Sequence, residues 1–123
     1  MRNSLRALVL VLFVAPAITT FAADTVVKGY LLDPSCAADL VKHERSAAGH
    51  TKGCLQLADC AKNGYGVLTD DRKFIKFDKE GNEQAKKFIA ALTQNKDIKV
   101  TVSGEVNGDT MTVSKIELQE AAR

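Results

Sequence analysis

The sequence predicts a mainly β, α+β protein: a five-stranded, OB-fold-like barrel with a helical, cysteine-containing insert between strands 1 and 2. Two observations lead to this class. Five segments are rich in β-branched and aromatic residues, and a helical pattern lies between the third and the fourth. The first two segments are separated by residues 33–64, which hold every cysteine and histidine of the chain. A plain α+β roll has a similar order of elements and is the second interpretation.

Residues 1–22 are predicted to be a secretory signal peptide. Two arginines give a positive start, residues 7–18 form an apolar run, and cleavage after Ala22 leaves small residues at both recognition positions. The apolar run is too short for a membrane helix, which needs about 20 residues. Residues 23–123 are then a single OB-like domain of a periplasmic or secreted protein, and we expect no membrane contact after cleavage.

The charge of the mature chain argues against nucleic-acid binding. The chain has 17 basic and 15 acidic residues, and Arg2 and Arg6 belong to the predicted signal, so the mature charge is near zero. The chain also lacks tryptophan. A neutral domain does not have the electrostatic footprint of a nucleic-acid binder. The partners left open are a protein and a metal ion.

The predicted domain begins with a strand at residues 25–32, which Asp33 and Pro34 end. Asp is a strong helix N-cap and Pro fits the first helical position, so we predict a helix over 34–44.

A loop with small and polar residues follows at 46–53, and a second helix starts near Thr51 or Lys52. Its buried face repeats at helical spacing: Cys54, Leu57, Ala58 and Ala61. Asn63 and Gly64 tolerate the left-handed conformation and end this helix.

Two short strands are predicted at 65–69 and 73–78, and a third helix starts at Asn82 as its cap. Its apolar face is Ala85, Phe88, Ile89 and Leu92. The last two strands span 98–106 and 110–118.

Asn107-Gly108 predicts the hairpin turn between these last two strands. The apolar residues Ile116 and Leu118 fall out of phase with Met111 and Val113, which indicates a bulge, and Gly104 marks a bend.

The candidate functional residues are the cysteines and histidines of the insert: Cys36, His43, His50, Cys54 and Cys60. Three thiols in an oxidising compartment cannot all pair within one chain. The first interpretation is a disulfide between Cys36 and either Cys54 or Cys60, with a spare thiol that is able to join two copies into a dimer. If Cys54 and Cys60 lie on one continuous helix, they are about 9 Å apart along its axis and too far apart to pair.

The second interpretation is a soft-metal site with Cys36, His50, Cys54 and Cys60 as ligands. Three thiolates and an imidazole form a tetrahedral zinc set, and thiolates also suit Cu⁺. The spacing lacks the C-x2-C pair that is typical of zinc motifs. We expect His43 to lie outside the site, because it is four residues after Asp39 on a solvated helix face.

The third interpretation is a periplasmic thiol-redox protein acting through Cys36. This residue falls at the third position of the predicted first helix, where the helix N-terminus favours a thiolate. The chain has no C-x-x-C and no nucleophile–base–carboxylate set or cofactor fingerprint. We therefore expect a binding or structural module and not an enzyme.

Three motifs resemble those of a group of small exported bacterial proteins. These are G-Y-L-x-D-x-x-C at 29–36, H-x3-C-x5-C-A-x-x-G-Y-G at 50–66, and V-x-V-x-G-x-x-x-G-D at 100–109. The resemblance covers nearly all of the mature chain and implies export and an OB-like core. The group has no assigned activity, so the resemblance implies no mechanism.

Overall fold

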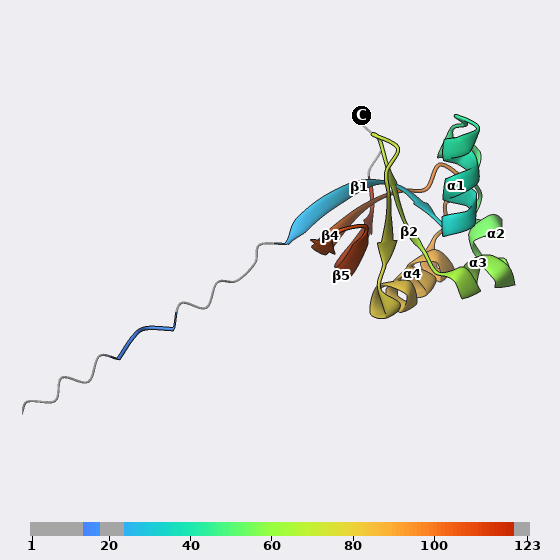
Figure 1. Ribbon diagram of the computed structural model, residues 1–123. Coiled ribbons are helices and arrows are strands. Elements are labelled where there is room, and N and C mark those ends of the chain that lie inside the picture. Colours follow the sequence, from blue (N-terminus) through green and yellow to red (C-terminus); the bar gives the residue numbers. More distant parts are fainter. Residues whose placement is uncertain (1–13, 18–23, 120–123) are drawn as a thin grey trace, which may run out of the picture.

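The computed structural model of the protein describes residues 14–17 and 24–119, so most of the predicted signal peptide, residues 1–22, lies outside the described residues. The described residues form a mixed α+β fold with five strands, which confirms the coarse prediction of a five-stranded α+β protein (Figure 1). In order along the chain, the elements are β1 (Thr25–Leu32), α1 (Pro34–Lys42), the short 3₁₀ turn η1 (Ala47–Gly49), α2 (Lys52–Leu55), α3 (Ala58–Asn63), β2 (Gly66–Thr69), β3 (Phe74–Phe77), α4 (Lys79–Ala91), β4 (Lys99–Asn107) and β5 (Thr110–Leu118).

The five strands form one closed sheet. Hydrogen-bonded neighbours run β1-β2-β3-β5-β4, and β4 pairs back to β1. All pairs are antiparallel except the short parallel pair of β3 with β5. The inward side chains of the strands and of α4 form the main core: Val27, Leu31, Leu55, Tyr65, Val67, Phe77, Ala85, Ile89, Ile98, Val100, Val102, Met111 and Val113.

The predicted bulge lies between β4 and β5. Ser103 pairs with Lys115 and Gly104 pairs with Val113, so the intervening Ser114 has no partner. A Cβ atom on Gly104 would lie 2.0 Å from the carbonyl oxygen of Thr112, so the close approach of the two strands requires glycine here. The shift in side-chain phase that the sequence showed is therefore a bulge in the structure.

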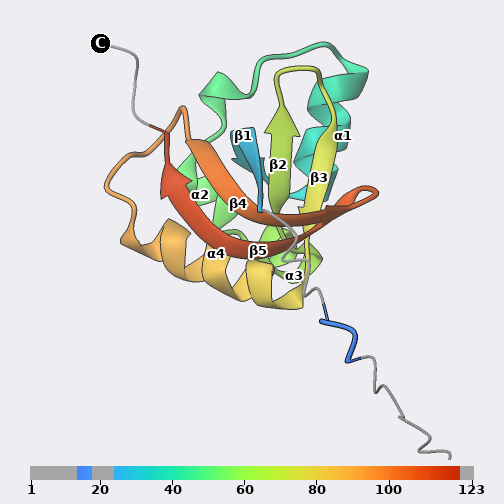
Figure 2. The ribbon, with the colours of Figure 1, turned by 90° about the vertical axis from the view of Figure 1, so that its left-hand side faces the viewer.

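The helices occupy two places around the sheet. Figures 1 and 2 show α1, α2 and α3 together on one side of the sheet, and α4 running across β5. All three helices of the first group lie in the connection between β1 and β2. No helix in the part of the chain described here is both long and apolar enough to span a membrane.

The start of α4 differs from the prediction. Asp78, not Asn82, is the N-cap, and its carboxylate accepts the backbone N–H of Gly81 at 2.8 Å. Asn82 lies inside the helix and accepts the backbone N–H of Tyr65 at 2.9 Å. A Cβ atom on Gly81 would lie 2.7 Å from a methyl group of Val113. Tight packing of α4 on the sheet thus explains a glycine in its first turn.

The predicted second helix is also wrong in two respects. Leu57 and Ala58, two residues of its expected buried face, are exposed, and the helix is broken into α2 and α3. Leu57 has an extended ψ of 140° and separates them. The hydroxyl of the buried Tyr65 donates a hydrogen bond of 2.7 Å to the carbonyl of Leu55. In a continuous helix that carbonyl would accept the N–H of Asp59. Because of this break, Cys54 lies on α2 and Cys60 lies on α3. The axial separation of about 9 Å, which holds for one continuous helix, therefore does not apply to these two residues.

Candidate metal centre

The candidate site is built on Asp33, where β1 ends and α1 begins. One oxygen of its carboxylate, Oδ2, accepts the backbone N–H groups of Ser35 at 3.1 Å and Cys36 at 3.2 Å. This is the N-cap that the Asp-Pro pair predicts. The residue is only 1% exposed. Its other oxygen, Oδ1, is buried and has no hydrogen-bond partner among residues 14–17 and 24–119. Half of a buried carboxylate is therefore unsatisfied.

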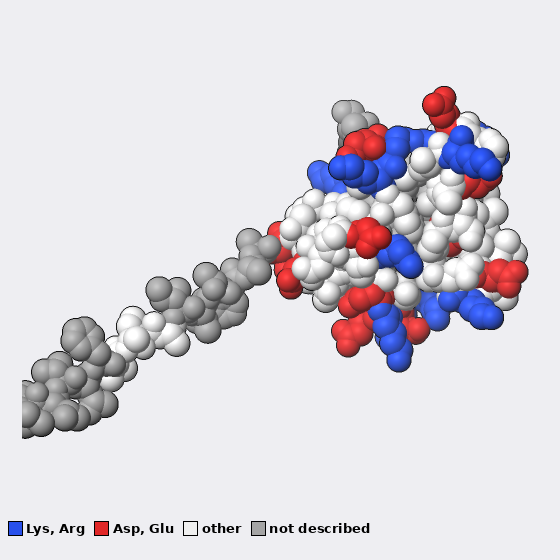
Figure 3. All heavy atoms as spheres, in the orientation of Figure 1, with Lys and Arg blue, Asp and Glu red and all other residues white. Residues whose placement is uncertain are grey.

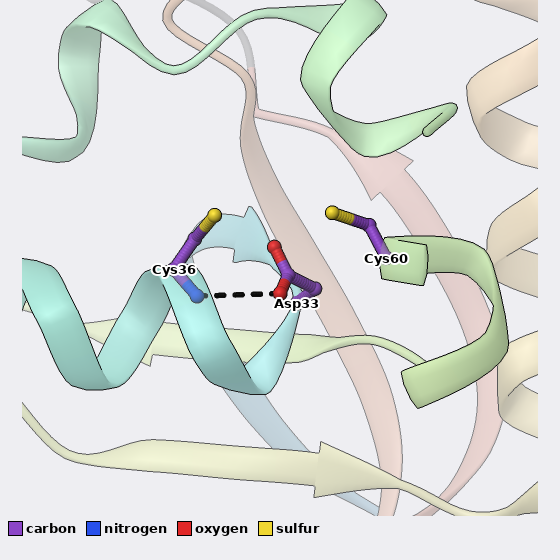
Figure 4. A group of neighbouring side chains, drawn as sticks. All are labelled: Asp33, Cys36 and Cys60. Carbon is purple, nitrogen blue, oxygen red and sulfur yellow. Dashed lines mark hydrogen bonds between the residues drawn. The ribbon is translucent and has the colours of Figure 1, made fainter. Parts of the chain in front are cut away.

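Two thiols face this unsatisfied oxygen. The sulfur atoms of Cys36 and Cys60 and a carboxylate oxygen of Asp33 all lie within 4.8 Å of one another. In Figure 4, Cys36 comes from α1 and Cys60 from α3, and the oxygen that does not accept the Cys36 N–H points between the two sulfurs. Neither thiol is aligned with Oδ1 as a hydrogen-bond donor, and none of the three cysteines is in a disulfide. The site brings together one oxygen and two sulfur donors.

The electrostatics of the cluster oppose ionisation of its thiols. Burial, followed by the close approach and charge of the Asp33 carboxylate, raises the pKa of Cys36 to about 12, and Cys60 and Cys54 raise it further. Burial and the charge of Asp33 also raise the pKa of Cys60. No lysine or arginine is among the leading influences on either thiol. The sequence favoured a thiolate for Cys36 at the start of α1, whereas burial and the Asp33 carboxylate raise the pKa of this thiol in the folded chain.

The carboxylate itself stays ionised. Burial alone would raise the pKa of Asp33, but interactions with the Cys36 thiol, the Cys36 N–H and the Cys60 thiol outweigh burial and lower it. At neutral pH the cluster therefore holds one buried negative charge and two neutral thiols. The site thus carries the negative charge of Asp33, and its two thiols can each become negative by losing a proton.

A pocket of about 540 Å³ opens beside the cluster. It is lined by Ser35, Cys36, Asp39, Leu40, Arg45, Ser46, Gly49, His50 and Cys54. Both ring nitrogens of His50 are buried and lack a partner within the described ranges. Burial lowers the pKa of His50, and the charge of Asp33 only partly offsets this, so the ring is neutral at neutral pH. A neutral imidazole is the form that binds metal ions.

The structure places the four predicted ligands in two groups. Cys36 and Cys60 lie in the cluster with Asp33, whereas His50 and Cys54 line the pocket. Among the residues that the structure describes, neither His50 nor Cys54 belongs to a set of three donor atoms within 4.8 Å of one another. Of the two disulfide candidates, the Cys36–Cys60 sulfurs are within 4.8 Å of each other. The Cys54 sulfur instead accepts a hydrogen bond of 3.2 Å from the Thr51 hydroxyl.

Asp33 is the donor that sequence reasoning missed. It was recognised as a cap, and a cap uses only one of the two carboxylate oxygens. The available signal was its position between a buried strand and a cysteine three residues later. His43 lies outside the site, as expected: it is exposed and 3.5 Å from Asp39 on the same helix.

The surface carries both signs of charge. Figure 3 shows acidic and basic side chains interspersed on one face of the domain. This mixture agrees with the near-zero charge of residues 23–123. It supports the expectation that nucleic acid is not the partner, which stays a prediction.

Comparisons of the chain with protein-family models, with curated proteins and with solved structures found no match. The resemblance to small exported bacterial proteins therefore stays an expectation from the three sequence motifs. The function has to be argued from the cluster and the pocket.

Proposed function

We propose that the protein is an exported binding module that holds one soft metal ion, Zn²⁺ or Cu⁺, between Asp33, Cys36 and Cys60. The observation that carries the proposal is the buried Oδ1 atom of Asp33, which points between two thiols and has no hydrogen-bond partner in the described chain. Leaving a buried polar group unpaired costs about 1–3 kcal/mol, and more when it is charged. A bound cation removes this cost.

The charges around the site support a cation as the missing partner. The negative charge of Asp33 raises the pKa values of both thiols, so it disfavours their ionised forms. No basic side chain is among the main influences on these two pKa values. A metal ion would reverse these influences, since it stabilises the carboxylate and both thiolates at once.

The donor types indicate the class of ion. Two thiolates and one carboxylate are ligands that Zn²⁺ accepts, and Cu⁺ prefers the sulfurs. Three protein donors leave a fourth tetrahedral position for water or another ligand. Such an open position suits a binding module or a carrier of the ion.

A Cys36–Cys60 disulfide is the competing function of the same residues. Their sulfurs are within 4.8 Å, and an exported protein meets an oxidising environment. A disulfide would require the two sulfurs to move to the bonding distance of about 2.05 Å. Cys54 would then be the spare thiol. A redox role through Cys36 as the attacking thiol is disfavoured, because its pKa of about 12 leaves little thiolate at neutral pH.

We infer that the closed sheet is OB-like and that the protein is periplasmic or secreted. Five strands with a helix between the third and the fourth support the fold, as does the long connection after the first strand, which is a habitual binding loop of OB-folds. The signal-like residues 1–22 support export.

The test is to purify the exported chain without reductant and to measure metal content and free thiols in the same sample. We expect one metal ion per chain, with Cys36 and Cys60 alkylated only after a chelator is added. A sample with no metal and only one thiol that reacts after denaturation would contradict the proposal and support the disulfide. Periplasmic and cytoplasmic fractions of the host test export.

A further inference from the structure

The pocket is connected to the metal cluster through one residue only. Of the three cluster residues, Cys36 lines the pocket, whereas Asp33 and Cys60 do not. Asp33 is 1% exposed, so an ion cannot meet it directly from solvent. An ion that enters through the pocket therefore meets Cys36 before it reaches Asp33.

The other soft donors of the pocket are His50 and Cys54. Both ring nitrogens of His50 are shielded from solvent and lack a protein partner in the described part of the chain. Buried polar atoms are normally paired, so an unpaired ring on the wall of a pocket indicates a ligand that enters there. The pocket is lined by an imidazole and two cysteines, residue types that favour a soft metal ion over harder cations.

We propose that His50 and Cys54 form a receiving site that captures the metal ion and passes it to the buried cluster by ligand exchange at Cys36. The inference rests on the proposed function, because it requires Asp33, Cys36 and Cys60 to be the resident site. Separate receiving and resident sites explain why the structure divides the cysteines and the histidine into two groups that share Cys36.

The exchange involves no oxidation or reduction. On capture, the Cys54 thiol releases a proton to water, and the His50 nitrogen and the Cys54 sulfur bind the ion, with water in its other positions. On transfer, the metal–His50 and metal–Cys54 bonds and the bonds to water break, and bonds to Cys36, Asp33 and Cys60 form. Cys36 and Cys60 each release a proton and Cys54 takes one up, so two protons leave for each ion bound.

The test measures the rate of zinc loading separately from its affinity. Zn²⁺ is supplied to the reduced mature chain from a chromophoric chelator, and its removal is followed in a stopped-flow instrument. We expect H50L and C54A to slow loading about tenfold while the equilibrium affinity changes by less than about threefold, because neither residue holds the resident ion. His43→Ala is the matched control, since His43 is exposed and lies outside the pocket lining.

A second control tests whether the ion instead enters the cluster from the side of α3. Asp59 is exposed and lies beside Cys60 on α3. If D59N slows loading and H50L does not, the ion enters at α3 and the inference is wrong. Unchanged loading rates in H50L and C54A also overturn it. A loss of affinity in H50L as large as in C60S overturns it too, because His50 would then be a resident ligand.

Other results would contradict the proposed function itself. These are a wild-type chain that binds no zinc, or a C60S variant that binds zinc as tightly as the wild type.

Discussion

Asp33 and Cys36 are coupled in two ways across one turn of α1. The Oδ2 atom of Asp33 accepts the backbone N–H of Cys36 at 3.2 Å and so caps the helix. The same carboxylate acts with burial to raise the pKa of the Cys36 thiol to about 12. The cap that starts the helix therefore also favours the protonated form of its cysteine.

Asp33→Asn should separate these two effects. Asparagine is as good an N-cap as aspartate, so α1 should stay formed, whereas Asp33→Ala should lose about 1 kcal/mol of stability through the lost cap. In both variants we expect zinc affinity to fall, because a negative oxygen donor is gone. Calorimetric zinc titration and denaturant unfolding measure the two quantities. Wild-type zinc affinity in D33N would mean that the carboxylate does not bind the ion.

The pH dependence of stability in the metal-free chain follows from the same residue. The pKa of Asp33 is below its ordinary value of 3.8 in the folded chain. Its ionised form therefore stabilises the fold above about pH 4, and this stabilisation is lost as the pH falls through the folded pKa. We expect D33N to lose less stability than wild type between neutral pH and pH 2, as measured by urea unfolding. Equal losses would show that Asp33 has no such role.

Cys36 should react slowly with alkylating agents at neutral pH in the reduced, metal-free chain. Its pKa of about 12 leaves very little thiolate, the form that reacts. In D33N the charge of Asp33 no longer raises this pKa, so the rate should increase and its pH profile should shift to lower pH. Mass spectrometry of peptides containing Cys36 follows the reaction. Fast alkylation of Cys36 in the wild type at pH 7 would revive the redox interpretation.

Metal affinity should fall steeply in acid. Both thiols of the cluster have raised pKa values, so each must lose a proton when the ion binds. Below both of these pKa values, the logarithm of the apparent affinity should rise by about two for each pH unit. Zinc titrations between pH 6 and pH 8 measure this slope. A slope near one would mean that a single thiolate binds the ion.

Tyr65 should matter for the geometry of the site although it binds nothing there. Its hydroxyl donates to the carbonyl of Leu55 where α2 and α3 divide. We expect Tyr65→Phe to lower the free energy of unfolding by about 1 kcal/mol and to weaken zinc binding, because α3 positions Cys60. Tyr30→Phe is the control, since the Tyr30 hydroxyl bonds the exposed Asp97. Equal effects of the two variants would contradict this role.

Much of the fold could be predicted from local patterns. The strand at Thr25–Leu32, the cap at Asp33 and the bulge beside Gly104 each leave a signal within a few residues. The start of α4 could not be predicted, because Gly81 is explained only by its packing against Val113, 32 residues later.

The candidate site could be predicted only as a region. The insert was predicted as the region of the site, whereas the structure divides its cysteines and His50 between a cluster and a pocket, with a helix break at Leu57. At that break the hydroxyl of the buried Tyr65 donates a hydrogen bond to the Leu55 carbonyl, a contact that no local pattern reveals. Asp33 was missed as a donor because its role as a helix N-cap already explained an aspartate at this position.

The most direct measurement of the central claim is the X-ray absorption spectrum of the chain loaded with one equivalent of zinc. The account predicts two sulfur ligands at about 2.3 Å, from Cys36 and Cys60, and oxygen or nitrogen ligands at about 2.0–2.2 Å, one of them from Asp33. The oxygen shell should change in D33N. A shell of three sulfurs and one nitrogen would contradict the account, because Cys54 and His50 would then be resident ligands in place of Asp33.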